Sequence, residues 1–178
     1  MKKLILLFLF VVYGLSAQEL SVEKKEIYFT FAHAFKTVKG HCEKIEIKGK
    51  IFKKDNILQA ELPFMIIVPV EGMRTGNSNR DSHLLETLDY TKHKQIIMNL
   101  KEVEASGDTY KLKALLKIKN VEKEVFTIAK YSRDGESSIL KGSFELSLKD
   151  FSIEAPSLLL IKVKDTVMID YKFILKSK

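Results

Sequence analysis

The chain has 178 residues, of which 46% are hydrophobic and 10% aromatic, and this length suits one domain with a substantial core. Its 30 lysines and arginines outnumber 23 aspartates and glutamates, giving a net charge of +7, but the basic residues are scattered along the chain. Nucleic-acid binding requires basic and aromatic side chains gathered on one face, so the composition argues against that function. A weak attraction to anionic membrane surfaces stays open.

Residues 1–17 have the pattern of a secretory signal peptide. Two lysines open the segment, an apolar run from residue 4 to 12 follows, and Ser16 and Ala17 offer a cleavage site. Counted on to Ser16, the apolar stretch spans about 13 residues, fewer than the roughly 20 that cross a bilayer, which disfavours an uncleaved anchor. We therefore expect a periplasmic or secreted protein whose single domain covers residues 18–178, with a charge of +5 once the two lysines are removed.

Most of the remaining chain alternates between apolar and polar residues with period two, the pattern of β-strands with one buried face. Clear examples are residues 26–33, 110–119 and 140–149. About eight such strands, joined by polar turns, predict an all-β antiparallel protein. Periodicity alone leaves open whether the sheet packs as a sandwich or closes into a barrel.

The segment from residue 73 to 94 is the main break in this pattern. Ser78 and Asp81 resemble a capping box, and three leucines follow at helical spacing. We therefore predict one short helix between the third and fourth strands. A second break, at residues 154–161 around Pro156, predicts a turn or short helix that covers one end of the sheet.

The stretch Thr-Gly-Asn-Ser-Asn-Arg-Asp-Ser-His-Leu-Leu, residues 75–85, resembles the most recognisable motif of the YceI-like family. Further similarity lies in residues 29–33 with Val38 and Gly40, and in residues 116–125, 147–153 and 163–169. The resemblance implies an exported protein that binds isoprenoid or other long-chain lipids. It also selects the barrel over the sandwich, so the expected fold is an antiparallel, lipocalin-like barrel of about eight strands.

Three positions depart from the family pattern. Cys42 stands where the family tends to carry an aromatic residue, Lys94-Gln95 where it tends to have Tyr-Pro, and Met98 where it tends to have Phe. These changes would alter the volume or the mouth of a pocket, so they leave the identity of the lipid undetermined.

The apolar residues on the inward strand faces have two interpretations, a packed core or the wall of an elongated pocket. With the resemblance, we expect a pocket that holds the chain of an isoprenoid, quinone or fatty-acid-type lipid. The alternative is a stress-related or structural module with a packed core, which contacts a protein through the doubly apolar strand at residues 62–70. The expected pocket residues are Phe29, Phe31, Ile47, Phe64, Ile66, Met98, Leu116, Phe144, Leu146, Ile169, Tyr171 and Phe173.

Four polar residues of the motif, Asn77, Arg80, Asp81 and His83, are expected at the rim of the pocket. There they would hydrogen-bond a polar head group or hold the helix in place. Asp81 and His83 do not indicate catalysis, because residues two apart on a helix point to different sides. We expect a non-enzymatic protein without a cofactor.

The histidines and the sole cysteine do not predict a metal site, because their spacing matches no compact ligand motif. Cys42 cannot form an intramolecular disulfide, and we expect its thiol to be buried. A homodimer stays open.

Overall fold

A computed structural model describes residues 17–33, 36–155, 157–158, 161–162 and 164–178. The expected signal peptide, except Ala17, lies outside these residues. In chain order the elements are β1 (Gln18–His33), β2 (Lys36–Cys42), β3 (Glu46–Lys48), β4 (Ile51–Lys54), β5 (Ile57–Ala60), β6 (Phe64–Pro69), the 3-10 helix η1 (Val70–Gly72), β7 (Met73–Arg74), α1 (Ser78–Thr87), β8 (Gln95–Ser106), β9 (Thr109–Ile118), β10 (Val121–Asp134), β11 (Ser137–Ser147), the 3-10 helix η2 (Lys149–Phe151), β12 (Ser157–Leu158), β13 (Ile161–Lys162) and β14 (Thr166–Ser177).

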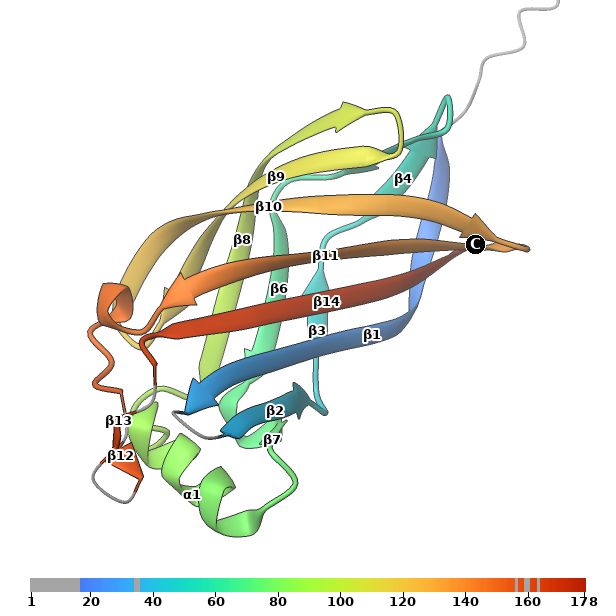
Figure 1. The fold of residues 1–178 in the computed structure, drawn as a ribbon. Helices are drawn as coiled ribbons and strands as arrows, with labels where there is room; N and C mark the ends of the chain where they lie inside the picture. Colours follow the sequence, from blue (N-terminus) through green and yellow to red (C-terminus); the bar gives the residue numbers. More distant parts are fainter. Residues whose placement is uncertain (1–16, 34–35, 156, 159–160, 163) are drawn as a thin grey trace, which may run out of the picture.

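Ten strands form one continuous antiparallel path, in the spatial order β3-β6-β8-β9-β10-β11-β14-β1-β2-β7. β4 pairs with β1 and β5, so the sheet has twelve strands, and β12 and β13 form a separate pair. The sheet curls strongly around an interior, and α1 lies at one end of it (Figure 1).

The structure confirms an all-β antiparallel fold with one helix, and it corrects the strand number and the helix position. The region expected to hold three strands before the helix holds seven, in part because turns divide residues 46–60 into three short strands. Gly49, between β3 and β4, has a φ of 118°, and Asp55 and Asn56 have φ values of 50° and 63°, the left-handed conformations of the tight turn in the β4–β5 hairpin. As a result, α1 follows the seventh strand rather than the third.

The expected closed barrel is also corrected, to a curled half-barrel whose hydrogen-bonded order has two ends, β3 and β7. Two backbone hydrogen bonds extend neighbouring ladders near these ends: the Glu43 amide donates to the Gly72 carbonyl at 2.8 Å beyond the β2–β7 pairing, and the Val70 amide donates to the Lys94 carbonyl at 2.9 Å beyond the β6–β8 pairing. The two ends are linked along the chain, by residues 43–45 between β2 and β3 and by η1 between β6 and β7.

One edge of β8 is open along part of its length. The pairing of β6 with β8 ends at Leu100, and a bulge follows between Leu100 and Glu102. Beyond it, residues 101–106 pair only with β9 within the described part of the chain, and all six are exposed. The wall of the half-barrel thus has a gap in its hydrogen bonding beside β5.

Inward-facing residues of each strand meet in a common core, as their alternation predicts. On β14, Tyr171, Phe173 and Leu175 are 7%, 6% and 0% exposed, whereas the intervening Lys172 and Ile174 are only partly buried. β14 lies between β1 and β11 and pairs with both along most of its length. This strand therefore anchors the centre of the sheet.

Helix α1 begins differently from the expected capping box. Asn77 is the N-cap, and its side-chain oxygen accepts a hydrogen bond from the Arg80 amide at 3.0 Å. Ser78 is the first helical residue, and the Asp81 carboxylate turns back to Thr75. Asparagine and serine are both good N-cap residues, so Asn77 and Ser78 could each have capped the helix. In the structure Asn77 is the N-cap.

The segment expected as a turn or short helix at residues 154–161 contains a small hairpin instead. Ser157 pairs with Lys162, and Leu158 pairs with Ile161. The residue before a proline is disfavoured in helical conformation, which works against a helix around Pro156. Pro156 itself lies outside the described residues. Phe151 and Ile153, 2% and 3% exposed, are the residues that seal the core before the hairpin.

Candidate functional site

The half-barrel encloses a cavity of about 420 Å³. This volume lies within the roughly 300–1,000 Å³ of small-molecule pockets, and it is far larger than the voids of a packed core. Side chains from the inner faces of most strands and from one side of α1 line it, and nearly all of them are apolar. The interior is therefore a ligand-sized apolar space.

All twelve residues expected in the pocket wall line this cavity. They come from seven strands that the chain reaches at widely separated positions, from Phe29 on β1 to Phe173 on β14. Their contact with a ligand stays a prediction. The twelve are Phe29, Phe31, Ile47, Phe64, Ile66, Met98, Leu116, Phe144, Leu146, Ile169, Tyr171 and Phe173.

Further lining residues were missed, although the alternation that identified their neighbours also marked most of them. Ile27 lies two positions before Phe29, and Leu112 and Ala114 share the inward face of Leu116. Tyr110 shares that face too, but its contact with Leu58 spans 52 residues of sequence and follows from no local pattern. Cys42, a departure from the family pattern, also lines the cavity.

The charged side chains among the described lining residues all come from α1. They are Arg80, His83 and Glu86. Asn77 and Asp81, also expected at the rim, are not lining residues. The structure therefore brings two of the four expected rim residues to the cavity and assigns the other two to the start of the helix.

Thr75 organises the polar contacts at the start of α1. The Asp81 carboxylate accepts hydrogen bonds from the Thr75 amide at 2.8 Å and from its hydroxyl at 2.6 Å. The Arg80 guanidinium donates to the Thr75 carbonyl at 3.0 Å. Desolvation raises the pKa of Asp81, but the Thr75 hydrogen bonds and the charges of Arg74 and Arg80 outweigh it and lower this pKa. Arg80 and Asp81 thus fix the helix.

His83 lines the cavity from α1 but its side chain is 73% exposed, and its Nδ1 is 3.2 Å from the Glu86 carboxylate. Asp81 is bonded elsewhere, so no acid–base pair forms between the two residues that the sequence placed two positions apart. Asp81 and His83 therefore do not form a catalytic pair.

Two glycines allow aromatic rings to lie flat against the sheet. A Cβ at Gly40 would lie 2.2 Å from Phe29 Cζ, and one at Gly142 would lie 2.4 Å from Tyr171 Oη. Each glycine faces its aromatic residue directly across the ladder. The missing side chains therefore determine where two cavity-lining rings lie.

Two phenol groups interrupt the apolar wall. The Thr127 hydroxyl donates to the Ser143 carbonyl at 3.0 Å, so the Tyr171 hydroxyl is the donor in its 3.1 Å contact with Thr127. Burial raises the pKa of Tyr171. The Tyr110 hydroxyl instead accepts a hydrogen bond from the Leu58 amide at 2.9 Å.

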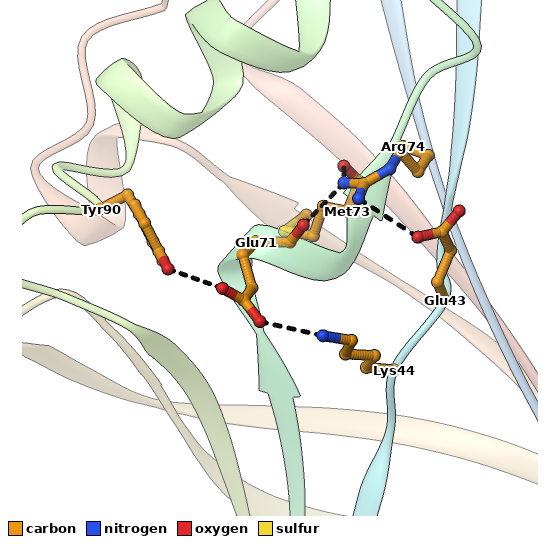
Figure 2. Close-up of polar contacts among 6 residues, drawn as sticks. All are labelled: Glu43, Lys44, Glu71, Met73, Arg74 and Tyr90. Atoms are coloured by element: carbon orange, nitrogen blue, oxygen red, sulfur yellow. Dashed lines mark hydrogen bonds and ion pairs between the residues drawn. The ribbon is translucent and has the colours of Figure 1, made fainter.

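A polar cluster surrounds η1 and β7 (Figure 2). The Glu71 carboxylate accepts hydrogen bonds from Lys44 at 3.0 Å and from the Tyr90 hydroxyl at 2.7 Å. Arg74 donates to the Glu71 carbonyl at 2.6 Å and pairs with the Glu43 carboxylate at 3.3 Å. The cluster thus ties the segment after β2 to η1, β7 and the segment after α1.

Replacing Glu71 with glutamine should lower the denaturation midpoint at neutral pH. The Tyr90 and Lys44 hydrogen bonds hold the pKa of Glu71 below its ordinary value of 4.5. A carboxylate with a depressed pKa stabilises the fold above its unfolded pKa, and that stabilisation is lost as the pH falls through the folded pKa. Urea unfolding of both proteins should therefore show a difference at pH 7 that shrinks toward pH 3.

Glu136→Gln, at the exposed turn between β10 and β11, provides the control and should leave the midpoint unchanged. A Glu71→Gln deficit that persists undiminished at pH 3 would show that the side-chain shape, and not the carboxylate charge, supports the cluster.

The remaining chemical groups offer little reactivity. Cys42 is buried as expected, and desolvation raises the pKa of its thiol to about 12, so it is a poor nucleophile. Within the described residues, no group of three or more His, Cys, Asp or Glu side chains is placed to hold a metal. The helix that the structure describes is too short to cross a bilayer.

A strongly curled antiparallel sheet around an apolar cavity, with a helix at one end, defines a class of half-barrel β-proteins. The chain belongs to the YceI-like domain family, whose pattern it matches over residues 19–175. This confirms the resemblance carried by the motif at residues 75–85. A comparison with curated protein sequences finds no significant match.

Solved structures share the fold at low sequence identity. The crystal structure of Burkholderia cenocepacia BcnA has a TM-score of 0.73 at 15% identity, covering 86% of this chain and 99% of that one. A polyisoprenoid binding domain from Saccharophagus degradans, implicated in plant cell wall breakdown, has a TM-score of 0.67 at 11% identity and covers 91% and 99%. The Campylobacter jejuni YceI protein has a TM-score of 0.66 at 15% identity and covers 100% and 99%.

Proposed function

We propose that this protein is an exported, non-enzymatic binding protein that holds the apolar chain of an isoprenoid, quinone or fatty-acid-type lipid. The observation that carries the proposal is the cavity of about 420 Å³ with its almost wholly apolar wall. A relative of the same fold is described as a polyisoprenoid binding domain, which supports the same ligand class.

The energetics of chain burial fit this proposal. Each buried methylene group contributes about 0.8 kcal/mol, so roughly ten of them offset the several kcal/mol that association costs. An apolar wall gives little discrimination between lipid chains of similar width, because dispersion and burial depend on area rather than on specific atoms. We therefore propose a chain-binding protein whose selectivity arises at its few polar positions.

The alternative, a packed-core interaction module, gains no support from the strand at residues 62–70. Ile67 and Val70, 5% and 1% exposed, are buried, and only Leu62, at 54%, presents a large apolar side chain to solvent. The cavity also contrasts with a packed core. We keep the lipid-binding proposal as the one that the geometry supports best.

Export, membrane contact and oligomeric state form part of the proposal. The sequence of residues 1–17 supports cleavage before Gln18 and a periplasmic or secreted location. The excess of basic residues supports a weak, salt-sensitive attraction to anionic membranes. The intact mass of the protein recovered from cells reports the cleavage site, and its native mass reports whether it is a homodimer.

The direct test is native mass spectrometry of protein purified gently from the periplasm, followed by organic extraction and identification of the retained molecule. We expect one lipid per protein. Replacing Ala114 with phenylalanine should abolish that retention, because Ala114 lines the cavity and is 2% exposed. The larger side chain would occupy space that the lipid chain needs.

Leu115→Phe is the matched control, because residue 115 lies on the opposite face of the same strand. Its lipid content should equal that of the unchanged protein. A clean apo mass for the unchanged protein, persisting after incubation with isoprenoid and quinone lipids, would contradict the proposed function and favour the interaction module.

A further inference from the structure

Tyr110 places one phenol group inside the cavity. It is 1% exposed, it lines the cavity from β9, and its hydroxyl accepts a hydrogen bond from the Leu58 amide at 2.9 Å. Its ring packs edge-on against Tyr131, with centroids 6.3 Å apart and an interplanar angle of 69°. Two contacts on different strands therefore hold the hydroxyl in place.

The Tyr110 hydroxyl still has a hydrogen to donate. A phenol donates one hydrogen bond in addition to those that it accepts, and its contact with the Leu58 amide uses only an acceptor position. Within the described residues, no acceptor for this hydrogen is present. Tyr171 differs, because its hydrogen is already donated to Thr127. A buried donor without an acceptor is costly, so a ligand atom that accepts from Tyr110 would be strongly favoured there.

Tyr110 lies far from α1. Tyr110 lies at the start of β9, next to the β8–β9 turn. The other end of the strand, at Ile118, is eight residues away, which corresponds to about 26 Å along a strand. Near the Tyr110 end, Gln59 and Val103 line the cavity and are also exposed, so the cavity reaches solvent there, beside the open edge of β8. Figure 1 shows the β8–β9 turn and α1 at opposite ends of the sheet.

The charges in the wall indicate the class of acceptor. Tyr110 is 1% exposed and the charged lining residues are all on α1, so a phosphate or pyrophosphate bonded to the Tyr110 hydroxyl would be desolvated without a positive partner in the described wall. A neutral carbonyl oxygen needs one donor and no counter-charge. The Tyr110 site therefore suits an ester, amide or quinone carbonyl.

We propose that the Tyr110 hydroxyl donates a hydrogen bond to the carbonyl oxygen of a neutral lipid, whose chain runs from there toward α1. This inference rests on the proposed lipid-binding function and adds an orientation and a head-group class. It reverses the orientation expected from the sequence, in which Arg80 and His83 meet the polar end.

The test compares two ligands of equal chain length, methyl palmitate, which has a carbonyl, and octadecane, which has none. Each displaces a fluorescent naphthylamine probe from the full mature protein. Tyr110→Phe should weaken methyl palmitate binding by about three- to tenfold, the value of one hydrogen bond, and change octadecane binding by less than about twofold. Tyr171→Phe, which removes a phenol whose hydrogen is already donated, should not separate the two ligands.

Equal weakening of both ligands in Tyr110→Phe would show a merely structural role and overturn the inference. Selective loss of methyl palmitate binding in His83→Leu, with Tyr110→Phe unchanged, would place the carbonyl at α1 and also overturn it. Failure of the unchanged protein to bind either ligand would instead contradict the proposed function.

A measurement on the unchanged protein avoids any effect of Tyr110→Phe on folding. Methyl palmitate labelled with carbon-13 at the carbonyl gives an infrared band that moves to lower frequency when the oxygen accepts a hydrogen bond. We expect this lower frequency in the complex. A band at the position found in dry hexane would contradict the contact with Tyr110.

Discussion

Phe144→Asp should leave the protein largely unfolded at neutral pH. Phe144 is 8% exposed and lines the cavity from β11, so the change removes a large apolar side chain and buries a carboxylate. Truncating a buried phenylalanine costs about 3–5 kcal/mol, and a desolvated, unpaired charge adds to this. The sum approaches the roughly 5–15 kcal/mol of total stability of a domain.

Circular dichroism and urea unfolding measure the loss of stability. Varying the pH separates the cost of the lost phenylalanine from the cost of the buried charge. Burial raises the pKa of an introduced carboxyl, so the penalty for its charge should decrease as the pH falls toward about 4. Phe144→Leu keeps the site apolar and should remain folded with reduced stability. A stably folded Phe144→Asp protein at pH 7 would mean that residue 144 faces water, contrary to the described core.

Gly40→Ala should destabilise the protein by about 1–3 kcal/mol and reduce its lipid binding. The added Cβ would lie 2.2 Å from Phe29 Cζ and 2.6 Å from the Arg74 carbonyl. The carbonyl belongs to the β2–β7 ladder and cannot move freely, so the Phe29 ring must shift into the cavity that it lines. Stability and pocket volume should therefore fall together.

Gly107→Asn is the control for Gly40→Ala, because nothing lies within 4 Å of a Cβ at Gly107. Its φ of 60° is a conformation that asparagine adopts readily, so the cost should be less than about 1 kcal/mol. Thermal unfolding and probe displacement check both variants. Equal losses in the two would show that backbone conformation, and not the Phe29 contact, governs the effect at Gly40.

The pocket wall was predictable because it depends on local alternation. One residue in two along a strand faces the interior, and this rule alone assigns Phe29, Phe64, Leu116 and Phe173 to the inner face that lines the cavity. The strand number was not predictable in the same way. It depends on where single residues such as Gly49 and Asn56 adopt a left-handed conformation, and several residues of these types elsewhere do not.

Contacts between distant residues account for the rest. The Leu58–Tyr110 hydrogen bond and the Glu43–Arg74 ion pair depend on strand neighbours that only the folded sheet defines. The rim illustrates the same limit: the motif correctly indicated a polar start of α1, but Asp81 bonds Thr75 and not a position at the cavity mouth. Sequence periodicity gives the face of a residue, and tertiary contacts give its partner.

The incomplete closure of the sheet has a consequence for the solubility of the protein. Free strand edges recruit other strands and lead to aggregation, and natural proteins protect them by making them short or charged. β3 and β7, the two ends of the sheet order, have three and two residues. The open edge of β8 carries Lys101, Glu102 and Glu104 and follows a bulge. The half-barrel can therefore have unpaired strand edges without offering a template for fibril growth.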